Sequence, residues 1–276
     1  MLTPVLRDLY RTKIVVTHGL APLWRSLSWY ISSKEYTNLT YEISAKSKKY
    51  LAEFLANIFN VSRDKVWAYM RELERDDTLA GHFMAQVSKT ADRYFADLPI
   101  KYGRRLGWYA AVRITKPRLV VEAGIDRGIG SCVLAAALLR NTQEGHHGKL
   151  IGLDINPSAG RYIAAPYDQV VEVVYWDSLD FLRTTDRSID FFLHDSRHSP
   201  EHESAEFDLV WPRLSGPGVV MSDNAHVTDS LFEFACGKSL GFWYWSEEVV
   251  NHIASPAGIG LAMEPRRTAH ARTPDP

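Results

Sequence analysis

Apolar residues in the first hundred positions recur with a helical spacing. Between residues 50 and 59 they fall at i, i+1, i+4, i+5, i+8 and i+9, which places them on one face of a helix. Asn60 is expected to end this helix, and Ser62 to cap a second one. A third helix is expected over about residues 83–95. Residues 1–104 are therefore predicted to form a helical N-terminal subdomain that caps a substrate site or mediates dimerisation.

The pattern changes after Pro117, where short β-branched runs begin to alternate with helical segments. The expected strands are residues 118–123, 149–154, 170–175, 189–194 and 219–222, and then 242–247 and 258–263 with no helix between the last two. This alternation predicts an α/β fold with a Rossmann-like, mostly parallel sheet of seven strands. The missing helix predicts that the last strand is antiparallel. Residues 105–264 are expected to form this domain, and residues 265–276 a disordered tail.

Composition and charge exclude several classes of protein. Hydrophobic residues make up 46% and charged residues 24% of the 276 residues, as in ordinary globular domains. A net charge of −1 argues against a nucleic-acid partner, because tight binding to a duplex needs a basic excess. The longest apolar runs, such as residues 133–139, are too short to span a membrane, and no secretory signal is evident. Cys132 and Cys236 cannot form a disulfide framework, so we expect a soluble, cytoplasmic protein.

Candidate chemistry lies where the predicted strands end, because open α/β sheets bind ligands beyond the carboxyl ends of their strands. The first strand runs into a glycine-rich turn, residues 122–131, whose spacing matches neither a dinucleotide fingerprint nor a phosphate-binding loop. After the second strand, Asp154 offers a carboxylate for two ribose hydroxyls, unless it only caps a helix. After the third, Trp176 and Asp177 place a ring beside a carboxylate, which suits an adenine. The order of these signals is more specific than any one of them.

The run from Val120 to Ser131 resembles the first motif of class I S-adenosylmethionine (SAM)-dependent methyltransferases, in particular small-molecule O-methyltransferases. The reversed last strand resembles the same family, over about residues 105–264. The resemblance implies SAM as the cofactor, with these contacts: Glu122, Gly124 and Ser131 around the methionine part, with Gly128 in the same turn, Asp154 at the ribose, and Trp176 with Asp177 at the adenine. The Asn-Pro-Pro-Tyr and Asp-Pro-Pro-Tyr motifs of nucleic-acid methyltransferases are absent.

The ends of the fourth and fifth strands carry candidate metal ligands. Asp195 at one end, and the pair Asp223 and Asn224 at the next, resemble the divalent-metal site of catechol-type and caffeoyl-CoA-type O-methyltransferases. Their oxygens suit Mg²⁺, which would lower the pKa of an acceptor hydroxyl. The general base of that family is a lysine three residues after the first aspartate. Here that position holds His198, and imidazoles are competent bases near neutral pH. His226 either adds to this site or begins the next helix.

Two other interpretations of these residues have to be weighed. The spacing of His194, His198 and His202 suggests zinc, but the first lies at a strand and the last in a helix that begins with proline. The three histidines therefore cannot share one helical face, and structural zinc sites usually include cysteine. Asp223 and Asn224 are alternatively the cap of the following helix, with no metal at all.

The sequence thus predicts a SAM-dependent O-methyltransferase that acts on a small biosynthetic molecule, such as a phenol or a sugar. A divalent metal would assist, with His198 as base and with Asp195 and His226 beside it. One alternative is metal-independent transfer to nitrogen or oxygen, and another is a SAM-binding module that does not methylate. The helical block is equally a lid over the pocket or a homodimer interface. Its tryptophans either select the acceptor or pack in a core: Trp24, Trp29, Trp67 and Trp108.

Overall fold

The core of the protein is a seven-stranded, mostly parallel β-sheet. The computed structural model describes residues 4–253 and 256–265. In order across the sheet the strands are β4 (Val171–Val174), β3 (Lys149–Leu153), β2 (Leu119–Ala123), β5 (Ile189–His194), β6 (Leu214–Ser222), β9 (Gly258–Met263) and β7 (Gly241–Ser246). Neighbours pair in parallel except at β9, which is antiparallel to both β6 and β7. The predicted α/β sheet with a reversed last strand is confirmed.

The central strands are apolar because both of their faces are covered. Consecutive residues of a strand point to opposite faces. Val120 accordingly packs into the core on one side of β2, whereas Val121 packs into the core on the other side. The parallel register places Ala123, the last residue of β2, beside Leu153 of β3 and His194 of β5. The carboxyl ends of these strands therefore meet at one edge of the sheet.

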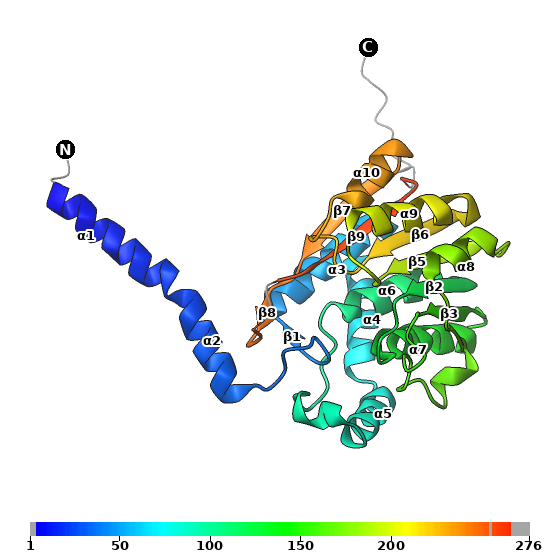
Figure 1. Cartoon of the computed structure of the whole chain (residues 1–276), viewed down its shortest axis with the longest axis horizontal. Helices are drawn as coiled ribbons and strands as arrows, with labels where there is room; N and C mark the ends of the chain where they lie inside the picture. The colour runs from blue at the N-terminus through cyan, green and yellow to red at the C-terminus, as the bar shows by residue number, and fades with distance from the viewer. Residues whose placement is uncertain (1–3, 254–255, 266–276) are drawn as a thin grey trace, which may run out of the picture.

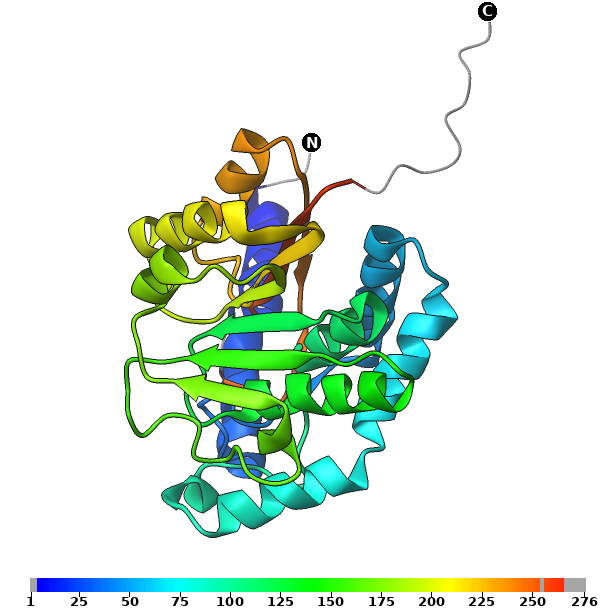
Figure 2. The same cartoon turned by 90° about the vertical axis from the view of Figure 1, so that its right-hand side faces the viewer.

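Helices cover both faces of the sheet (Figures 1 and 2). The α-helices of the described residues are α1 (Pro4–Ile14), α2 (Ala21–Ser32), α3 (Ala45–Phe59), α4 (Arg63–Glu74), α5 (Asp77–Ser88), α6 (Arg105–Thr115), α7 (Ile129–Gln143), α8 (Ser178–Thr184), α9 (Pro200–Val210) and α10 (Ser230–Gly237). On one face α6 and α7 pack on the strands and carry α3, α4 and α5. On the other face lie α8, α9 and α10.

Local sequence signals set the ends of the N-terminal helices. As predicted, α3 ends at Asn60, whose φ of 51° is left-handed, and Ser62 caps α4 with its side chain. The third helix differs from the predicted span of residues 83–95. It begins earlier, because the Asp76 carboxylate caps it, and residues 91–94 form a separate 3₁₀ turn. Gly81 therefore lies inside α5 and does not end it, because the helix already begins at the Asp76 cap.

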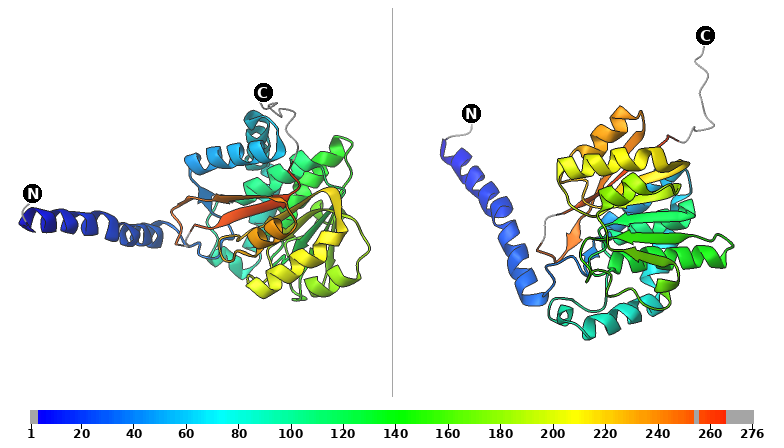
Figure 3. Two further views of the ribbon diagram at one scale, coloured as in Figure 1. Left: turned by 90° about the horizontal axis from the view of Figure 1, so that it is seen from above. Right: turned by 45° about the vertical axis from the view of Figure 1, so that its right-hand side comes forward.

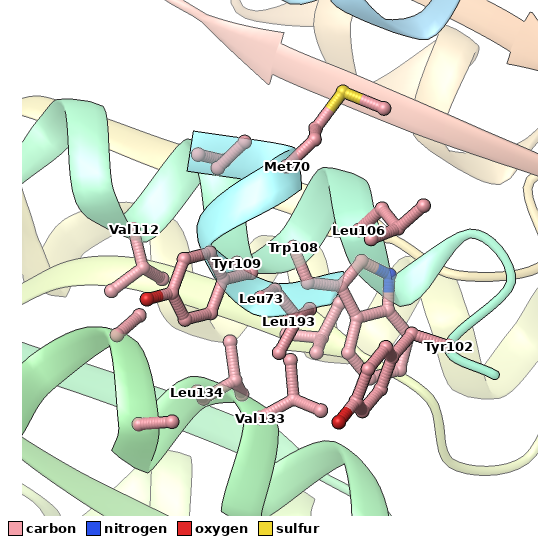
Figure 4. Packing of buried hydrophobic residues seen from close by; sticks show 14 of the residues in the cluster. Met70, Leu73, Tyr102, Leu106, Trp108, Tyr109, Val112, Val133, Leu134 and Leu193 are labelled. Carbon is pink, nitrogen blue, oxygen red and sulfur yellow. The ribbon is translucent and has the colours of Figure 1, made fainter. Parts of the chain in front are cut away.

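Trp108 belongs to the hydrophobic core, as Figure 4 shows. It is 1% exposed and packs from α6 in the cluster that contains Val133 of α7 and Leu193 of β5. Met70 and Leu73 of α4 reach the same cluster. Helices before and after residue 104 therefore share one core with the sheet. For Trp108, packing is the interpretation that the structure supports.

Helices α1 and α2 form an arm that projects from the body of the protein (Figures 1 and 3). Apolar side chains are exposed along it, including Leu9, Leu23, Trp24 and Ile31. The arm does not contribute to the cavity described below. Its role as a lid or as a homodimer interface stays a prediction.

Two short strands, β1 (Glu42–Ile43) and β8 (Val249–Val250), pair near the base of the arm. In the part of the chain that the structure describes, no helix has the length and hydropathy needed to cross a membrane. The predicted disordered tail lies, from residue 266 onward, outside the described residues.

Candidate active site

A cavity of about 400 Å³ opens at the carboxyl ends of the sheet's parallel strands. Its lining consists of Gly124, Asp126, Leu153, Asp154, Ile155, Trp176, Asp177, Ser178, Asp195, Ser196, Arg197 and His202. Five residues predicted from the sequence are among them: Gly124, Asp154, Trp176, Asp177 and Asp195. The volume lies in the range of cofactor and drug-sized sites. The chain therefore has its largest concentration of predicted ligand-binding residues at this edge of the sheet.

The glycine-rich turn after β2 forms one wall of the cavity. Gly124 has a φ of +85°, and a Cβ atom there would lie 2.2 Å from the backbone oxygen of Asp195. Both the backbone conformation and the close approach require glycine. Gly128 has a φ of +91° and caps α7, where a Cβ atom would clash with the Ile163 side chain. Gly128 thus shapes the turn but does not line the cavity.

Asp154 connects the end of β3 to this turn. Its Oδ2 atom accepts hydrogen bonds from the backbone N–H groups of Ile125 and Asp126, both at 3.1 Å. Its Oδ1 atom accepts the N–H of Asn156 at 2.9 Å, within a turn rather than a helix. Each carboxylate oxygen has two acceptor positions, so Oδ1 retains one for a ligand hydroxyl.

Trp176 and Asp177 line the cavity beyond the end of β4. Asp177 caps α8, because its Oδ1 atom accepts the backbone N–H groups of Leu179 and Asp180. Among the described residues, Oδ2 of Asp177 makes no hydrogen bond and is free to accept one from a ligand. Trp176 is 44% exposed beside it. This pair offers an aromatic surface next to an open carboxylate oxygen.

Glu122 and Ser131 lie beneath the turn and do not line the cavity. Glu122 is 1% exposed, and its Oε2 atom accepts a hydrogen bond from the Ser131 hydroxyl at 2.5 Å. Burial raises the pKa of Glu122 to about 8, although the Ser131 hydroxyl and the Arg105 charge act in the opposite direction. The side chain supports the turn from below. Contact of Glu122 or Ser131 with the methionine part of a cofactor stays a prediction.

Arg104 occupies the place where the resemblance put a divalent cation. Its Nε atom donates to Oδ1 of Asp223 at 2.7 Å, and its Nη2 atom donates to Oδ2 of Asp223 and, at 3.1 Å, to Oδ1 of Asn224. Its Nη1 atom donates to the Tyr41 hydroxyl and to Glu247. All five N–H groups of the guanidinium are thereby used.

The predicted metal site does not fit these residues. The positive charge of Arg104, whose side chain is 6% exposed, already faces the oxygens of Asp223 and Asn224 that a cation would need, and it would repel that cation. Burial and the neighbouring Asp223 carboxylate raise the pKa of Asp195 well above its usual range, against the smaller opposing effect of the Arg104 charge. In this structure an internal arginine–aspartate pair lies where the magnesium ion was expected, and these residues as arranged do not form a cation site. Magnesium dependence itself stays a prediction.

His198 lies between the cavity edge and this pair. Its Nε2 atom accepts a hydrogen bond from the Asn224 amide nitrogen at 2.8 Å and lies 3.8 Å from Oδ1 of Asp195. Its Nδ1 atom lies 3.1 Å from Nε2 of His194 and 3.3 Å from Oε1 of Glu203. The structure thus brings together His198, Asp195 and Asn224, as the sequence predicted, and adds two buried groups behind them.

His194 is held between two buried carboxylates. Its Nδ1 atom lies 2.5 Å from Glu206, and its Nε2 atom lies 3.2 Å from Glu203. Burial on its own lowers the pKa of His194, but the hydrogen bonds to these carboxylates outweigh it and raise the pKa to about 9. His202 instead contacts Glu206 from the cavity side, at 3.0 Å. His194 ends β5 and His202 belongs to α9, so the three histidines do not share one helical face, as predicted.

His226 lies in a second, neighbouring groove of about 380 Å³. The other lining residues are Ala225, Thr228, Asp229, Leu231, Phe232, Phe242 and Tyr244. Burial and the Arg104 charge lower the pKa of His226. Helix α10 begins only at Ser230, with Asp229 at its cap position, so Asp223 and Asn224 do not cap it. The groove continues the site beyond Asn224 with mostly apolar side chains.

Several residues of the site carry no sequence signal. Arg104 lies before α6, far from every strand end, and reaches the site only because α6 packs beside the sheet. In the sequence, Glu203 and Glu206 look like ordinary exposed charges on a helix. The spacing of the two glutamates, three residues apart on α9, places them on one helix face. That face could have been predicted to point at the strand that precedes the helix.

Comparison with known proteins agrees with this geometry. Residues 121–225 match a family model described as a methyltransferase domain. The O-methyltransferase TomG from Streptomyces achromogenes, involved in tomaymycin synthesis and determined with SAM, is 21% identical with a TM-score of 0.52, covering 69% of this chain and 90% of TomG. An O-methyltransferase from Bacillus cereus, determined with S-adenosylhomocysteine (SAH), is 16% identical with a TM-score of 0.50; the match covers 69% of this chain and 92% of that protein. No curated protein sequence matches the chain.

The family match identifies residues 121–225 as a methyltransferase domain. At such low identities the two structures show a shared fold. The predicted resemblance to methyltransferases is therefore confirmed, and the two neighbours with this fold are O-methyltransferases determined with SAM or SAH. The matched segment includes both the glycine-rich turn and the Asp223–Asn224 pair.

Proposed function

We propose that this protein transfers the methyl group of SAM to the hydroxyl of a small aromatic molecule, without a divalent cation. One observation carries the proposal. Within a methyltransferase domain, a single cavity collects Gly124, Asp154 and Asp177 from three consecutive strand ends. Each of the two carboxylates retains an acceptor position that the protein does not use. A nucleoside with a ribose diol and an amino-substituted base supplies the matching donors.

The residues present fit SAM or its product SAH. Asp154 would accept from the ribose, Asp177 from the adenine amino group, and Trp176 would cover the base. Gly124 would offer its backbone to the methionine part from the cavity wall, and no larger residue fits there, because a side chain would collide with the backbone at Asp195. When bound, SAM supplies an electrophilic methyl group on a sulfonium. The protein's own contribution is to hold the acceptor oxygen in line with that methyl group.

The Arg104 pair supports a metal-independent reaction. The guanidinium places a fixed positive charge beside Asp223 and Asn224, where a cation would otherwise be bound. Because it is buried and bonded through five N–H groups, it orients Asn224 instead of moving with a substrate. Metal-assisted transfer, the first expectation from the sequence, would require Arg104 to leave two buried carboxylates. The alternative from the sequence, in which Asp195 and Asp223 orient groups, is the one the geometry favours.

His198 is the proposed general base. Its Nε2 atom carries a lone pair toward Asn224 and Asp195, at the edge of the cavity. The imidazole would take the proton of the acceptor hydroxyl as the oxygen bonds to the methyl carbon. Asp195 is placed to hold or orient that hydroxyl. His226 would contact the acceptor from the second groove.

The second groove favours an aromatic acceptor over a sugar. Its walls include Leu231, Phe232, Phe242 and Tyr244, which offer apolar and aromatic surface. A phenol presents one hydroxyl on an apolar ring and matches this surface, whereas each further sugar hydroxyl would lose its hydrogen bonds to water. His226 of this groove lies close enough to Arg104 and His198 to interact with their charges. The acceptor hydroxyl would therefore approach His198 from this side.

The proposal is tested by incubating the purified protein with SAM and a panel of phenols and sugars, with and without EDTA, and measuring SAH and methylated product. We expect turnover of phenols that survives EDTA. His198→Ala should lose most of the turnover while its affinity for SAH stays near that of the wild type. The exposed His147→Ala is the matched control. Binding of SAH without consumption of SAM by any acceptor would instead indicate a module that does not methylate.

A further inference from the structure

Two buried carboxylates behind His198 are not used by the reaction proposed above. Glu203 is 1% exposed and Glu206 is 0% exposed, and both project from α9 toward the end of β5. Glu206 accepts from His194, His202, Ser178 and Ser196 and is fully satisfied within the protein. Glu203 differs, because one of its oxygens faces the imidazole that we propose as the base. Its function can be derived from the hydrogen bonds around it.

The orientation of the Asn224 amide decides which nitrogen of His198 carries the proton. The Arg104 guanidinium has only donors, so the Asn224 atom that it contacts must be the amide oxygen. The other end of the amide is then the NH₂ group, which donates to Nε2 of His198 at 2.8 Å. Nε2 is therefore an acceptor without a hydrogen. In a neutral imidazole the proton must then reside on Nδ1.

Two atoms face the Nδ1–H group of His198: Nε2 of His194 at 3.1 Å and Oε1 of Glu203 at 3.3 Å. Both nitrogens of His194 themselves face carboxylates, Nδ1 at Glu206 and Nε2 at 3.2 Å from the same Oε1, so they donate and Glu203 is the acceptor. The Thr228 hydroxyl donates to Oε2 of the same carboxylate and fixes its plane. Burial alone raises the pKa of Glu203, but the hydrogen bonds from His194, His198 and Thr228 outweigh it and lower the pKa to about 2. Glu203 is thus an ionised acceptor throughout the neutral range.

We propose that Glu203 is the positioning residue of His198: it accepts the Nδ1–H bond and keeps the Nε2 lone pair directed at the acceptor hydroxyl. This inference rests on the proposed function. In the reaction the acceptor hydroxyl replaces the Asn224 amide at Nε2. Its oxygen bonds to the methyl carbon, the electron pair of the carbon–sulfur bond stays on sulfur, and its proton moves to Nε2. The resulting imidazolium is stabilised by the carboxylate at its opposite nitrogen.

The same three groups also meet the distance criterion for a metal ion. Ligand atoms of His194, His198 and Glu203 lie within 4.8 Å of one another. A ligand nitrogen must offer a lone pair, however, and the Asn224 amide already takes the lone pair of His198 at Nε2, which leaves a proton at Nδ1. The hydrogen bonds therefore favour a carboxylate–imidazole pair. A bound metal becomes one outcome of the test.

The first measurement is ¹⁵N NMR of the histidine side chains in the full-length wild type, which requires no activity. We expect His198 to be protonated at Nδ1 near neutral pH, assigned by its loss in His198→Ala. In Glu203→Gln the Asn224 amide still donates to Nε2, so the proton should stay on Nδ1. Its bond to a charged carboxylate becomes a bond to a neutral amide oxygen, so the Nδ1–H resonance should move upfield. A wild-type proton on Nε2, or an Nδ1–H resonance that is the same in both proteins, would overturn the inference. A stoichiometric metal in the wild type that is lost in the variant would also overturn it.

The second measurement uses turnover. Glu203→Gln should lower kcat by about 10- to 1000-fold, because it impairs a base whose own contribution is typically about 10²- to 10⁴-fold, with the KM values for SAM and acceptor nearly unchanged. The exposed Glu201→Gln on the same helix is the matched control and should keep wild-type kcat. Glu203→Asp, which retains a carboxylate, should recover part of the loss. A wild type without any turnover refutes the proposed function and leaves the NMR result to decide this inference alone.

Discussion

Glu122→Gln should make the protein more stable, and by an amount that grows with pH. The pKa of Glu122 is raised by burial from 4.5 to about 8 in the folded protein. Between these values the folded state keeps a proton that the unfolded state has lost, so stability falls by about 1.4 kcal/mol per pH unit. From pH 5.5 to 7.5 the loss is about 3 kcal/mol. The glutamine side chain of the variant does not titrate, and its carbonyl can still accept from the Ser131 hydroxyl.

The assay is urea denaturation followed by tryptophan fluorescence, for both proteins at pH 5.5, 6.5 and 7.5. Other titrating groups cancel in the difference between the two free energies of unfolding. The difference should rise by roughly 2–3 kcal/mol over this range in favour of the variant. Glu53→Gln, at an exposed position of α3, should show no such trend. Parallel stability curves for wild type and Glu122→Gln would show that burial does not keep Glu122 protonated.

Three further predictions concern the glycine-rich turn, Arg104 and the buried Glu206. Gly124→Ala should lower stability by several kcal/mol and abolish SAH binding, as measured by denaturation and by calorimetric titration. At Gly81 an added Cβ atom meets no atom within 4 Å, so Gly81→Ala should stabilise by about 0.5–1 kcal/mol in the same denaturation assay. Arg104→Met should cost about 3–5 kcal/mol, because two buried carboxylates lose their partner, and millimolar Mg²⁺ should recover part of the loss in the variant only. The pKa of Glu206 is lowered to about 2, so the stability advantage of the wild type over Glu206→Gln, complete above pH 4.5, should shrink as the pH falls through 4.5 toward 2 in thermal melts.

Most of the fold could be predicted because local patterns and tertiary structure agree. The alternation of buried strands and helices after Pro117 is set by burial on both faces of the sheet. The left-handed Asn60 and the Ser62 cap are likewise local signals with local outcomes. The predicted start of α5 was wrong. Gly81 interrupts the helical pattern of the sequence, but in the structure it lies inside α5, which begins at Asp77 because the Asp76 side chain caps it.

The carboxylates that line the cavity could be predicted from the sequence, but the position of Arg104 beside them could not. Strand ends converge in any parallel sheet, so Asp154, Asp177 and Asp195 could be placed together from topology alone. The occupant of the cation position could not, because Arg104 arrives from an element that follows no strand, and its five hydrogen bonds depend on tertiary packing. Glu122 shows the same limit: its position in the turn predicts ligand contact, while its burial beneath the turn is visible only in the structure.

Whether the cavity binds the cofactor is decided by a calorimetric titration of the full-length protein with SAH, repeated on Asp154→Ala and Asp177→Asn. We expect micromolar binding by the wild type that EDTA does not change. Binding should be lost in Asp154→Ala, which releases both the turn and the ribose acceptor, and clearly weakened in Asp177→Asn. Absence of binding by the folded wild type, or equal binding by all three proteins, would contradict the assignment of this cavity to SAM.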